Sequence, residues 1–209
     1  MIFDLIQTGK EPFAADFQVM RGNVCCGNMH LSGKLGSMEG LLDGQFGADF
    51  VHMQRCATRR APNTSTVFRP YEILLNSGSF GYIYQTEQKN GWFDKFQFHQ
   101  LQANGQYFNM YPIGFGEQGA KCPVYCGERQ IALIEKECVV YNDLHQYHVL
   151  SLDESAGLIA YLFCNYMYTL ACYEPGVQTK KSCAKYISVT KNKTLLQKYN
   201  PDFVYQIQA

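Results

Sequence analysis

Cysteines and histidines are the side chains that could carry chemistry in the middle of the chain. Cys122 and Cys126 are spaced C-x₃-C, and Cys138, His145 and His148 follow them. A structural zinc site needs four ligands in a tetrahedron and commonly uses a C-x₂-C pair, but no such pair occurs in the sequence. On one strand the first two thiols would lie about 13 Å apart, at about 3.3 Å per residue. We therefore expect packed thiols and surface imidazoles, with no metal and no cofactor.

Two further patterns fall short of catalytic motifs. Cys25 and Cys26 are adjacent, and Arg21 is the nearby cation that could stabilise a thiolate, but we interpret the pair as structural. Asn76–Gly81 is close to a kinase glycine-rich loop, but its first glycine is Asn and the other kinase signatures are absent. Ser77 takes the first glycine position of G-x-S-x-G, so the pattern of a serine hydrolase is not met. The segment predicts a hairpin turn, and we expect no enzyme.

Lysines gather in the last part of the chain, and we define residues 177–209 as a basic tail. Six Lys and two acidic residues follow Tyr173. Of the 18 basic and 18 acidic residues in the chain, 12 basic and 16 acidic residues therefore precede it. The zero net charge gives no basic field for nucleic acid. Lys180, Lys181 and Lys185 follow an apolar segment directly, which is the position of a polybasic lipid contact. We predict that these three bind an anionic phospholipid surface; a protein partner and a solvated face are the alternatives.

The segment before these lysines is long and uncharged. Ser155 to Tyr173 holds 19 residues without a charge, preceded by a capping-box pattern at Ser151–Glu154 and ended by Pro175-Gly176. A helix that is apolar on every side is either a membrane span or the centre of a core. Asn165 and tyrosines spread along the run favour the core. We predict a buried helix at about residues 154–173, with hydrogen-bond partners for its polar groups and no transmembrane span.

Short apolar stretches and turn residues dominate the rest of the chain. Asn90-Gly91 and Asn104-Gly105 each lie between two such stretches, and Asn-Gly is the favoured pair of a type I′ hairpin. Aromatic residues make up 14% and charged residues 17%, which suits half-buried strands. We predict strands at Phe17–Met20, Val24–Cys26, Phe46–Met53, Tyr71–Leu75, Phe80–Thr86, Trp92–Phe98, Tyr107–Tyr111, Pro123–Cys126, Gln130–Lys136, Cys138–Tyr141, Tyr147–Leu152 and Lys185–Thr190. Ala61–Thr66 predicts a loop, and Thr194–Tyr199 predicts a short helix.

The fold class follows from these elements. The sequence predicts one mainly β domain over residues 1–209, an antiparallel closed barrel or roll with one central hydrophobic helix near its C-terminal end. Nine Cys, an odd number, and the absence of an apolar signal in Met1–Phe13 predict reduced thiols and a cytoplasmic location.

Part of the chain also resembles a known family. The residues concerned are Tyr111–Gly114, Cys122–Tyr125, Gln130–Lys136, Tyr141–Asp143 and the apolar helix after them. This order is similar to that of the tubby C-terminal-like superfamily, which includes tubby domains, LURP-one-related proteins and phospholipid scramblases. The resemblance implies a twelve-stranded barrel closed around a central hydrophobic helix. It implies phosphoinositide binding as in tubby or lipid scrambling as assigned to scramblases, but tubby's headgroup-binding residues and the scramblases' cysteine-rich and metal-binding segments have no match here.

We therefore expect a non-catalytic binding or scaffold domain, and peripheral binding to anionic phospholipid is its most specific form. A thiol- or imidazole-dependent enzyme or metalloprotein is one alternative, since nine Cys and five His are available. A membrane-anchored, scramblase-like protein is the other alternative, because the apolar run is long enough to span a bilayer.

Overall fold

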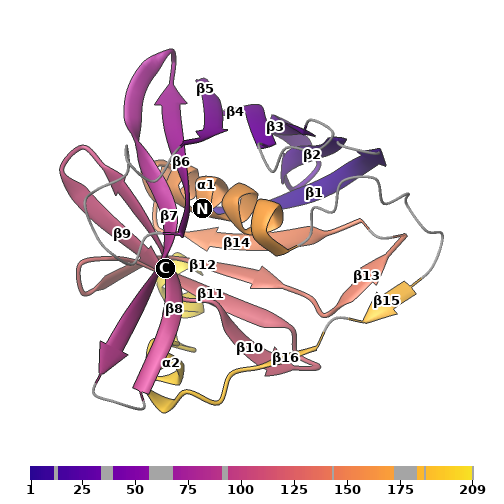
Figure 1. The fold of residues 1–209 in the computed structure, drawn as a ribbon. Coiled ribbons are helices and arrows are strands. Elements are labelled where there is room, and N and C mark those ends of the chain that lie inside the picture. The colour runs from indigo at the N-terminus through magenta and orange to yellow at the C-terminus, as the bar shows by residue number, and fades with distance from the viewer. Residues whose placement is uncertain are drawn as a thin grey trace.

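Strands close into a ring around a helix in the computed structural model (Figure 1). The structure describes residues 1–11, 14–33, 40–56, 68–90, 94–142, 144–171, 183–185 and 187–208. Within these ranges twelve antiparallel strands form a closed barrel in the order β12-β14-β1-β2-β3-β4-β5-β6-β7-β8-β9-β11, and β11 pairs back with β12. The sequence prediction of a mainly β barrel with a central helix near the C-terminal end is confirmed.

The barrel strands follow one another along the chain almost without exception. Their bounds are β1 Ile2–Glu11, β2 Ala14–Arg21, β3 Val24–Gly33, β4 Gly40–Phe46, β5 Asp49–Arg55, β6 Phe68–Leu75, β7 Gly78–Asn90, β8 Asp94–Ala103, β9 Gln106–Met110, β11 Ala120–Cys126, β12 Arg129–Lys136 and β14 Gln146–Ser151. Four short strands lie outside the ring, with bounds β10 Ile113–Gly116, β13 Val139–Tyr141, β15 Cys183–Lys185 and β16 Ser188–Val189. β10 pairs with β11 and β16, and β13 pairs with β15.

The turns show why the hairpins form where the sequence places them. Asn104 and Gly105 both have positive φ, 49° and 75°, as a type I′ turn requires. Asn76 and Ser77 do the same between β6 and β7, with φ of 50° and 67°, so the glycine-containing segment there is a hairpin turn as predicted. β7 and β8 also pair as predicted, with Asn90 opposite Asp94, although residues 91–93 lie outside the described ranges.

Several sequence expectations for the strands were wrong. Phe46–Met53 was expected to be one strand, but it contains the turn of the β4–β5 hairpin, with Gly47 at φ 60°. Lys185–Thr190 was also expected to be one strand, but β15 and β16 divide it and pair with different partners. β1 and β10 were not expected at all. The predicted loop at Ala61–Thr66 lies outside the described residues.

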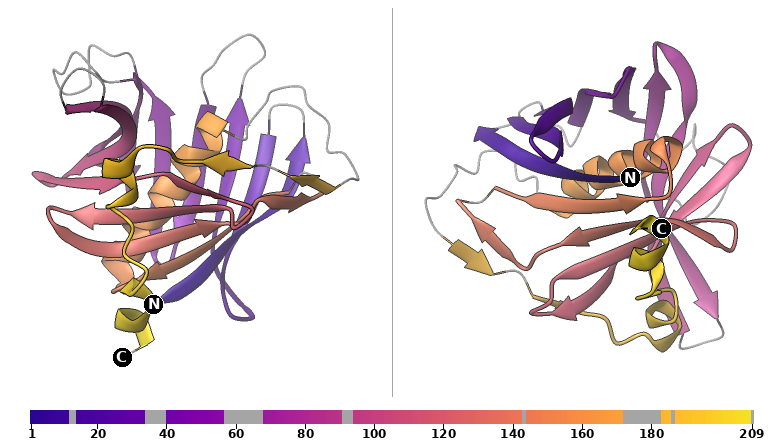
Figure 2. Two further views of the ribbon diagram at one scale, coloured as in Figure 1. Left: turned by 90° about the horizontal axis from the view of Figure 1, so that it is seen from below. Right: turned by 180° about the vertical axis from the view of Figure 1, so that it is seen from behind.

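The central helix α1 (Glu154–Ala171) passes through the barrel, as the views in Figure 2 show. Every residue from Ala156 to Tyr166 is buried, which confirms the predicted core position. Its predicted last residues, 172 and 173, lie outside the described ranges. Among the described helices, none combines the length and the hydropathy that a membrane crossing requires.

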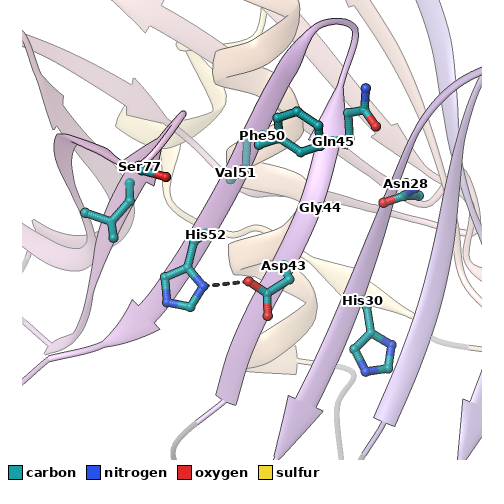
Figure 3. Close-up of a pocket in the computed structure, with 10 residues that line it drawn as sticks. Asn28, His30, Asp43, Gly44, Gln45, Phe50, Val51, His52 and Ser77 are labelled. Carbon is teal, nitrogen blue, oxygen red and sulfur yellow. Dashed lines mark hydrogen bonds and ion pairs between the residues drawn. The ribbon is translucent and has the colours of Figure 1, made fainter.

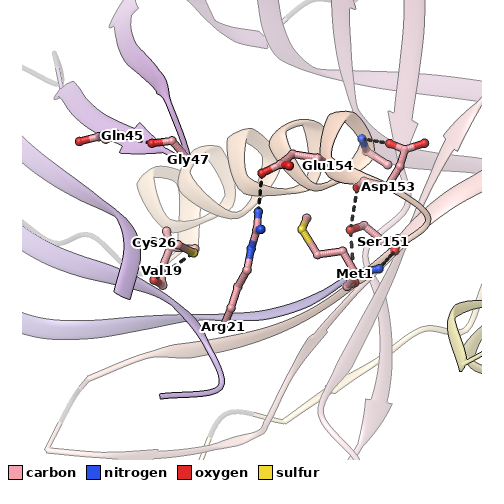
Figure 4. A network of polar contacts seen from close by, with 10 residues as sticks. Met1, Val19, Arg21, Cys26, Gln45, Gly47, Ser151, Asp153 and Glu154 are labelled. Atoms are coloured by element: carbon pink, nitrogen blue, oxygen red, sulfur yellow. Dashed lines mark hydrogen bonds and ion pairs between the residues drawn. The ribbon is translucent and has the colours of Figure 1, made fainter. Parts of the chain in front are cut away.

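The start of α1 differs from the predicted capping box (Figure 4). Asp153 is the capping side chain, because its Oδ1 accepts a hydrogen bond of 2.8 Å from the backbone N–H of Ala156. Ser151 cannot cap the helix, since it ends β14, where its N–H donates to the carbonyl of Met1. Glu154 instead forms an ion pair of 2.7 Å with Arg21, which links the first turn of α1 to β2.

Hydroxyl groups fix the helix against the barrel wall. Tyr161 donates to the carbonyl of Asn28 at 2.7 Å, and Gly44 gives it room, since a Cβ on Gly44 would lie 2.3 Å from the Tyr161 hydroxyl. Tyr166 donates to the carbonyl of Arg69 at 3.0 Å. The Tyr168 hydroxyl accepts a hydrogen bond of 3.0 Å from Gln7 Nε2. The predicted partners of these three tyrosines are therefore present.

Asn165 departs from the same expectation. Its Nδ2 donates to the carbonyl of Tyr161 at 2.8 Å, but its buried Oδ1 accepts no hydrogen bond from the described residues. An unpaired buried oxygen of this kind costs about 1–3 kcal/mol. The barrel therefore tolerates one unsatisfied group at the middle of its helix.

The C-terminal segment covers part of the outer wall. Leu195 of α2 (Lys193–Leu196) packs on Phe96, Phe98, Tyr111 and Ile113. Phe203 of α3 (Phe203–Gln208) packs on Leu133 and Leu150. This cover explains why β12 is buried on both faces from Gln130 to Ile134. The predicted helix at Thr194–Tyr199 corresponds to α2.

Phe163 and Phe50 offer a direct test of the central helix. Phe163 on α1 is fully buried, and Phe50 on β5 is 63% exposed. We expect Phe163→Ala to lower the free energy of unfolding by about 3–5 kcal/mol, because a closed sheet cannot collapse into the cavity. Phe50→Ala should change it by no more than about 0.5 kcal/mol. Urea titrations of both variants measure this, and equal small effects would contradict an enclosed helix.

His99 makes stability depend on pH. Its ring on β8 is buried and meets the Tyr166 ring edge-on, with 5.4 Å between centroids. Loss of solvation lowers the pKa of His99 from 6.5 to about 4. Between these values the unfolded chain binds a proton that the folded protein does not bind, so the free energy of unfolding falls as the pH falls.

This loss should reach about 3 kcal/mol at the acid end of the window. We expect His99→Leu to flatten the dependence of the urea midpoint between about pH 6.5 and about pH 4. Gln97→Leu, which introduces the same side chain at an exposed position of the same strand and removes no titratable group, is the matched control and should leave the slope unchanged. An unaltered slope in His99→Leu would show that other groups cause the acid sensitivity.

Candidate functional site

A largely apolar hollow of about 350 Å³ lies at the end of the barrel where α1 ends, and we call it the barrel-mouth pocket. Its walls come from elements far apart in the sequence: Ala120 and Cys122 of β11, Tyr147 of β14, Met167 of α1 and Ile187 before β16. Cys122 and Tyr147 belong to the barrel core, so the pocket continues the apolar interior to the surface. Its volume lies within the usual range of small-molecule sites.

Polar groups stand at one side of this pocket. Lys136, Glu137 and His145 line it and also line a second hollow of about 330 Å³ on the other side. His145 is buried, and its backbone N–H donates to Oε1 of Gln7 at 3.0 Å. Gln7 Nε2 in turn donates to the hydroxyl of Tyr168, whose ring lies 5.8 Å from that of His145. These bonds hold the backbone of His145 in place between the two hollows.

Burial keeps the thiol of Cys122 in the pocket protonated. Cys122 Sγ lies 3.9 Å from Sδ of Met167, and burial raises the pKa of the Cys122 thiol to about 12. Burial also raises the pKa of Cys164 well above its ordinary value. Because the thiolate is the nucleophile and the metal ligand, these protonated thiols are poorly suited to both roles.

Three of the cysteines and histidines singled out in the sequence, Cys122, Cys138 and His145, line the barrel-mouth pocket, whereas Cys126 and His148 lie outside it. Cys126 lies at the far end of β11 from Cys122, and Cys138 donates a hydrogen bond to the carbonyl of Glu117. His148 on β14 pairs with Asp4 of β1 through Nδ1 at 2.8 Å. Within the described ranges, no group of three or more His, Cys, Asp or Glu residues is arranged to hold a metal ion.

The predicted lipid-binding lysines are placed only in part. Lys185 lies on β15, and its Nζ is 2.6 Å from Oε1 of Glu117, an ion pair that raises the pKa of Lys185. Lys180 and Lys181 lie outside the described residues. Lys185 stands opposite Val139 in the β13–β15 pair, beside the second hollow.

Exposed apolar side chains accompany this lysine. Tyr141, Ile187 and Val189 are 67%, 58% and 63% exposed, and all three lie on or next to β13, β15 and β16. We call these three residues the apolar rim. Ile187 belongs both to the apolar rim and to the wall of the barrel-mouth pocket. No periodic pattern in the sequence marks this surface, because its strands are two or three residues long.

A third concave surface lies on the outside of β3, β4 and β5, and we call it the outer groove (Figure 3). It has a volume of about 570 Å³ and includes Asn28, Gln45, Phe50 and Ser77. Two imidazole–carboxylate pairs cross its strands. Figure 3 shows that the His52 ring and the Asp43 side chain point toward one another.

These pairs belong to one row of the sheet. Asp16, His30, Asp43 and His52 stand opposite one another on β2, β3, β4 and β5. His30 Nδ1 is 2.7 Å from Asp16, and His52 Nδ1 is 2.6 Å from Asp43. Sequence reasoning missed this row, because cross-strand register joins positions that share no local pattern.

Fold and pocket together define a closed β-barrel with a central apolar helix and a ligand-sized apolar opening at one end. Comparison with protein-family models, with curated proteins and with solved structures finds no match to this chain.

Proposed function

We propose that the chain is a non-catalytic binding domain whose pocket end contacts an anionic phospholipid surface from the cytoplasmic side. The observation that carries the proposal is the apolar rim, whose residues lie on or next to the short strands β13, β15 and β16, and β15 also carries Lys185. Exposed apolar side chains rimmed by cations are the combination that peripheral membrane contact uses. The cytoplasmic leaflet is the one that carries a negative surface potential.

The architecture supports the proposal by a second route. The resemblance to the tubby C-terminal-like superfamily implied twelve strands closed around a hydrophobic helix, and the described barrel has that arrangement. Lipid contact recurs among the functions of that superfamily. The buried, protonated thiols of Cys122 and Cys164 favour binding over thiol catalysis at this end of the barrel.

Charge reversal of the predicted lysines tests the proposal. We expect the full chain to co-sediment with liposomes of phosphatidylcholine and phosphatidylserine, more strongly at low than at moderate salt. Lys180→Glu, Lys181→Glu and Lys185→Glu combined should weaken this binding about a hundredfold, at about 1 kcal/mol for each lysine near the surface. Equal binding to neutral and acidic liposomes would contradict the proposal.

Two single variants sharpen the test. Glu117→Gln releases Lys185 from its ion pair and should strengthen binding to acidic liposomes severalfold, since Glu117 is exposed and its removal also lowers the negative charge. Lys95→Glu is the matched control, because Lys95 is an exposed lysine on β8 that pairs with Glu87. An equal loss of binding in Lys95→Glu and in Lys185→Glu would indicate a response to net charge alone.

A further inference from the structure

We propose that the barrel-mouth pocket takes the end of a single acyl chain from the lipid, an inference that rests on the proposed membrane contact. The lining of the pocket is largely apolar, and Ala120, Cys122, Tyr147, Met167 and Ile187 contribute carbon and sulfur to it. A chain end that enters it leaves water for an environment continuous with the barrel core. Burial of this kind is worth about 0.8 kcal/mol for each methylene group.

The route into the pocket is also apolar. Ile187 lines the pocket and is 58% exposed, and the apolar rim to which it belongs includes Val189. A membrane that covers the rim therefore covers the opening. An acyl chain could pass from the bilayer to the pocket along Ile187 without crossing water, whereas a polar ligand would lose its hydration there.

The charged groups at the opening suit a headgroup left outside. Lys136 is half-buried and Glu137 is exposed at the side of the pocket, so both can reach solvent. Cys122 is buried and the half-buried Met167 lies beside it, and a neutral thiol and a thioether adapt to a flexible apolar chain. Charged groups at the side of the pocket, with sulfur and carbon in its wall, match an amphiphile that enters tail first.

Binding of soluble amphiphiles, without any membrane, tests the pocket itself. Dodecanoate below its critical micelle concentration and dodecanol below its solubility limit are titrated into the full chain, and binding is followed by calorimetry. We expect both to bind with one-to-one stoichiometry and within tenfold of one another, because the chain and not the headgroup supplies the affinity. Absence of saturable binding by both, or binding of dodecanoate alone, would overturn the proposal.

Variants that fill the pocket locate the site. Ala120→Trp places a ring inside the pocket and should weaken dodecanol binding at least tenfold. Ile187→Trp narrows the opening from an exposed position that the barrel core does not depend on, so it keeps the test valid if Ala120→Trp does not fold. Asn28→Trp puts the same ring in the outer groove and should leave binding unchanged. An equal loss in Asn28→Trp, or no loss in Ile187→Trp, would place the ligand elsewhere.

The two proposals fail differently. The Lys185→Glu variant should weaken binding to acidic liposomes and keep dodecanol binding, because Lys185 is not a residue of the pocket wall. If the wild-type chain binds dodecanol but no liposomes, the acyl-chain site stands and the membrane contact falls. If it binds acidic liposomes but neither dodecanol nor dodecanoate, the membrane contact stands and the acyl-chain site is refuted.

Discussion

An α-helix without a polar face must be surrounded on every side, and the rest of this structure follows from that constraint. Eleven consecutive residues of α1, from Ala156 to Tyr166, are buried. An open sheet covers one side of a helix, so enclosure requires a sheet that closes on itself, as it does where β11 pairs with β12. The close approach is set by details such as Gly44, whose missing side chain leaves space for the Tyr161 hydroxyl. Closure in turn removes the free edges that a long sheet would expose.

The sequence predicted the elements whose signals are local. Asn104-Gly105 predicts a turn because both residues accept positive φ. The uncharged run of α1 predicts a buried helix because it has no polar face. The prediction of a capping box was wrong because Ser151 is the last residue of β14, where its backbone N–H donates a hydrogen bond to the carbonyl of Met1. The β4–β5 hairpin was not predicted, because a turn at Gly47-Ala48 inside an apolar run resembles the interior of a strand in the sequence.

The candidate site was harder to predict because it belongs to no single segment. The walls of the barrel-mouth pocket come from β11, β14, α1 and the residue before β16, which meet only when the ring is closed. The cysteines drew attention as possible ligands, but burial makes Cys122 a neutral wall atom. Charge clustering in the sequence predicted a binding role for Lys185. Its ion pair with Glu117 could not be predicted, since nothing in the sequence indicates that β15 lies beside the residues after β10.

The order of the elements along the chain has a consequence for synthesis. Nine barrel strands leave the ribosome before β11, β12, β14 and α1, which complete the wall and fill it. The hydrogen bonds of Tyr161 and Tyr168 reach back to Asn28 and Gln7, so the earliest strands acquire their inner contacts last. A nascent chain of this kind is a curved sheet with an uncovered apolar face, and contacts of such long sequence separation form slowly. The exposed apolar surface that chaperones would cover is therefore largest before α1 emerges.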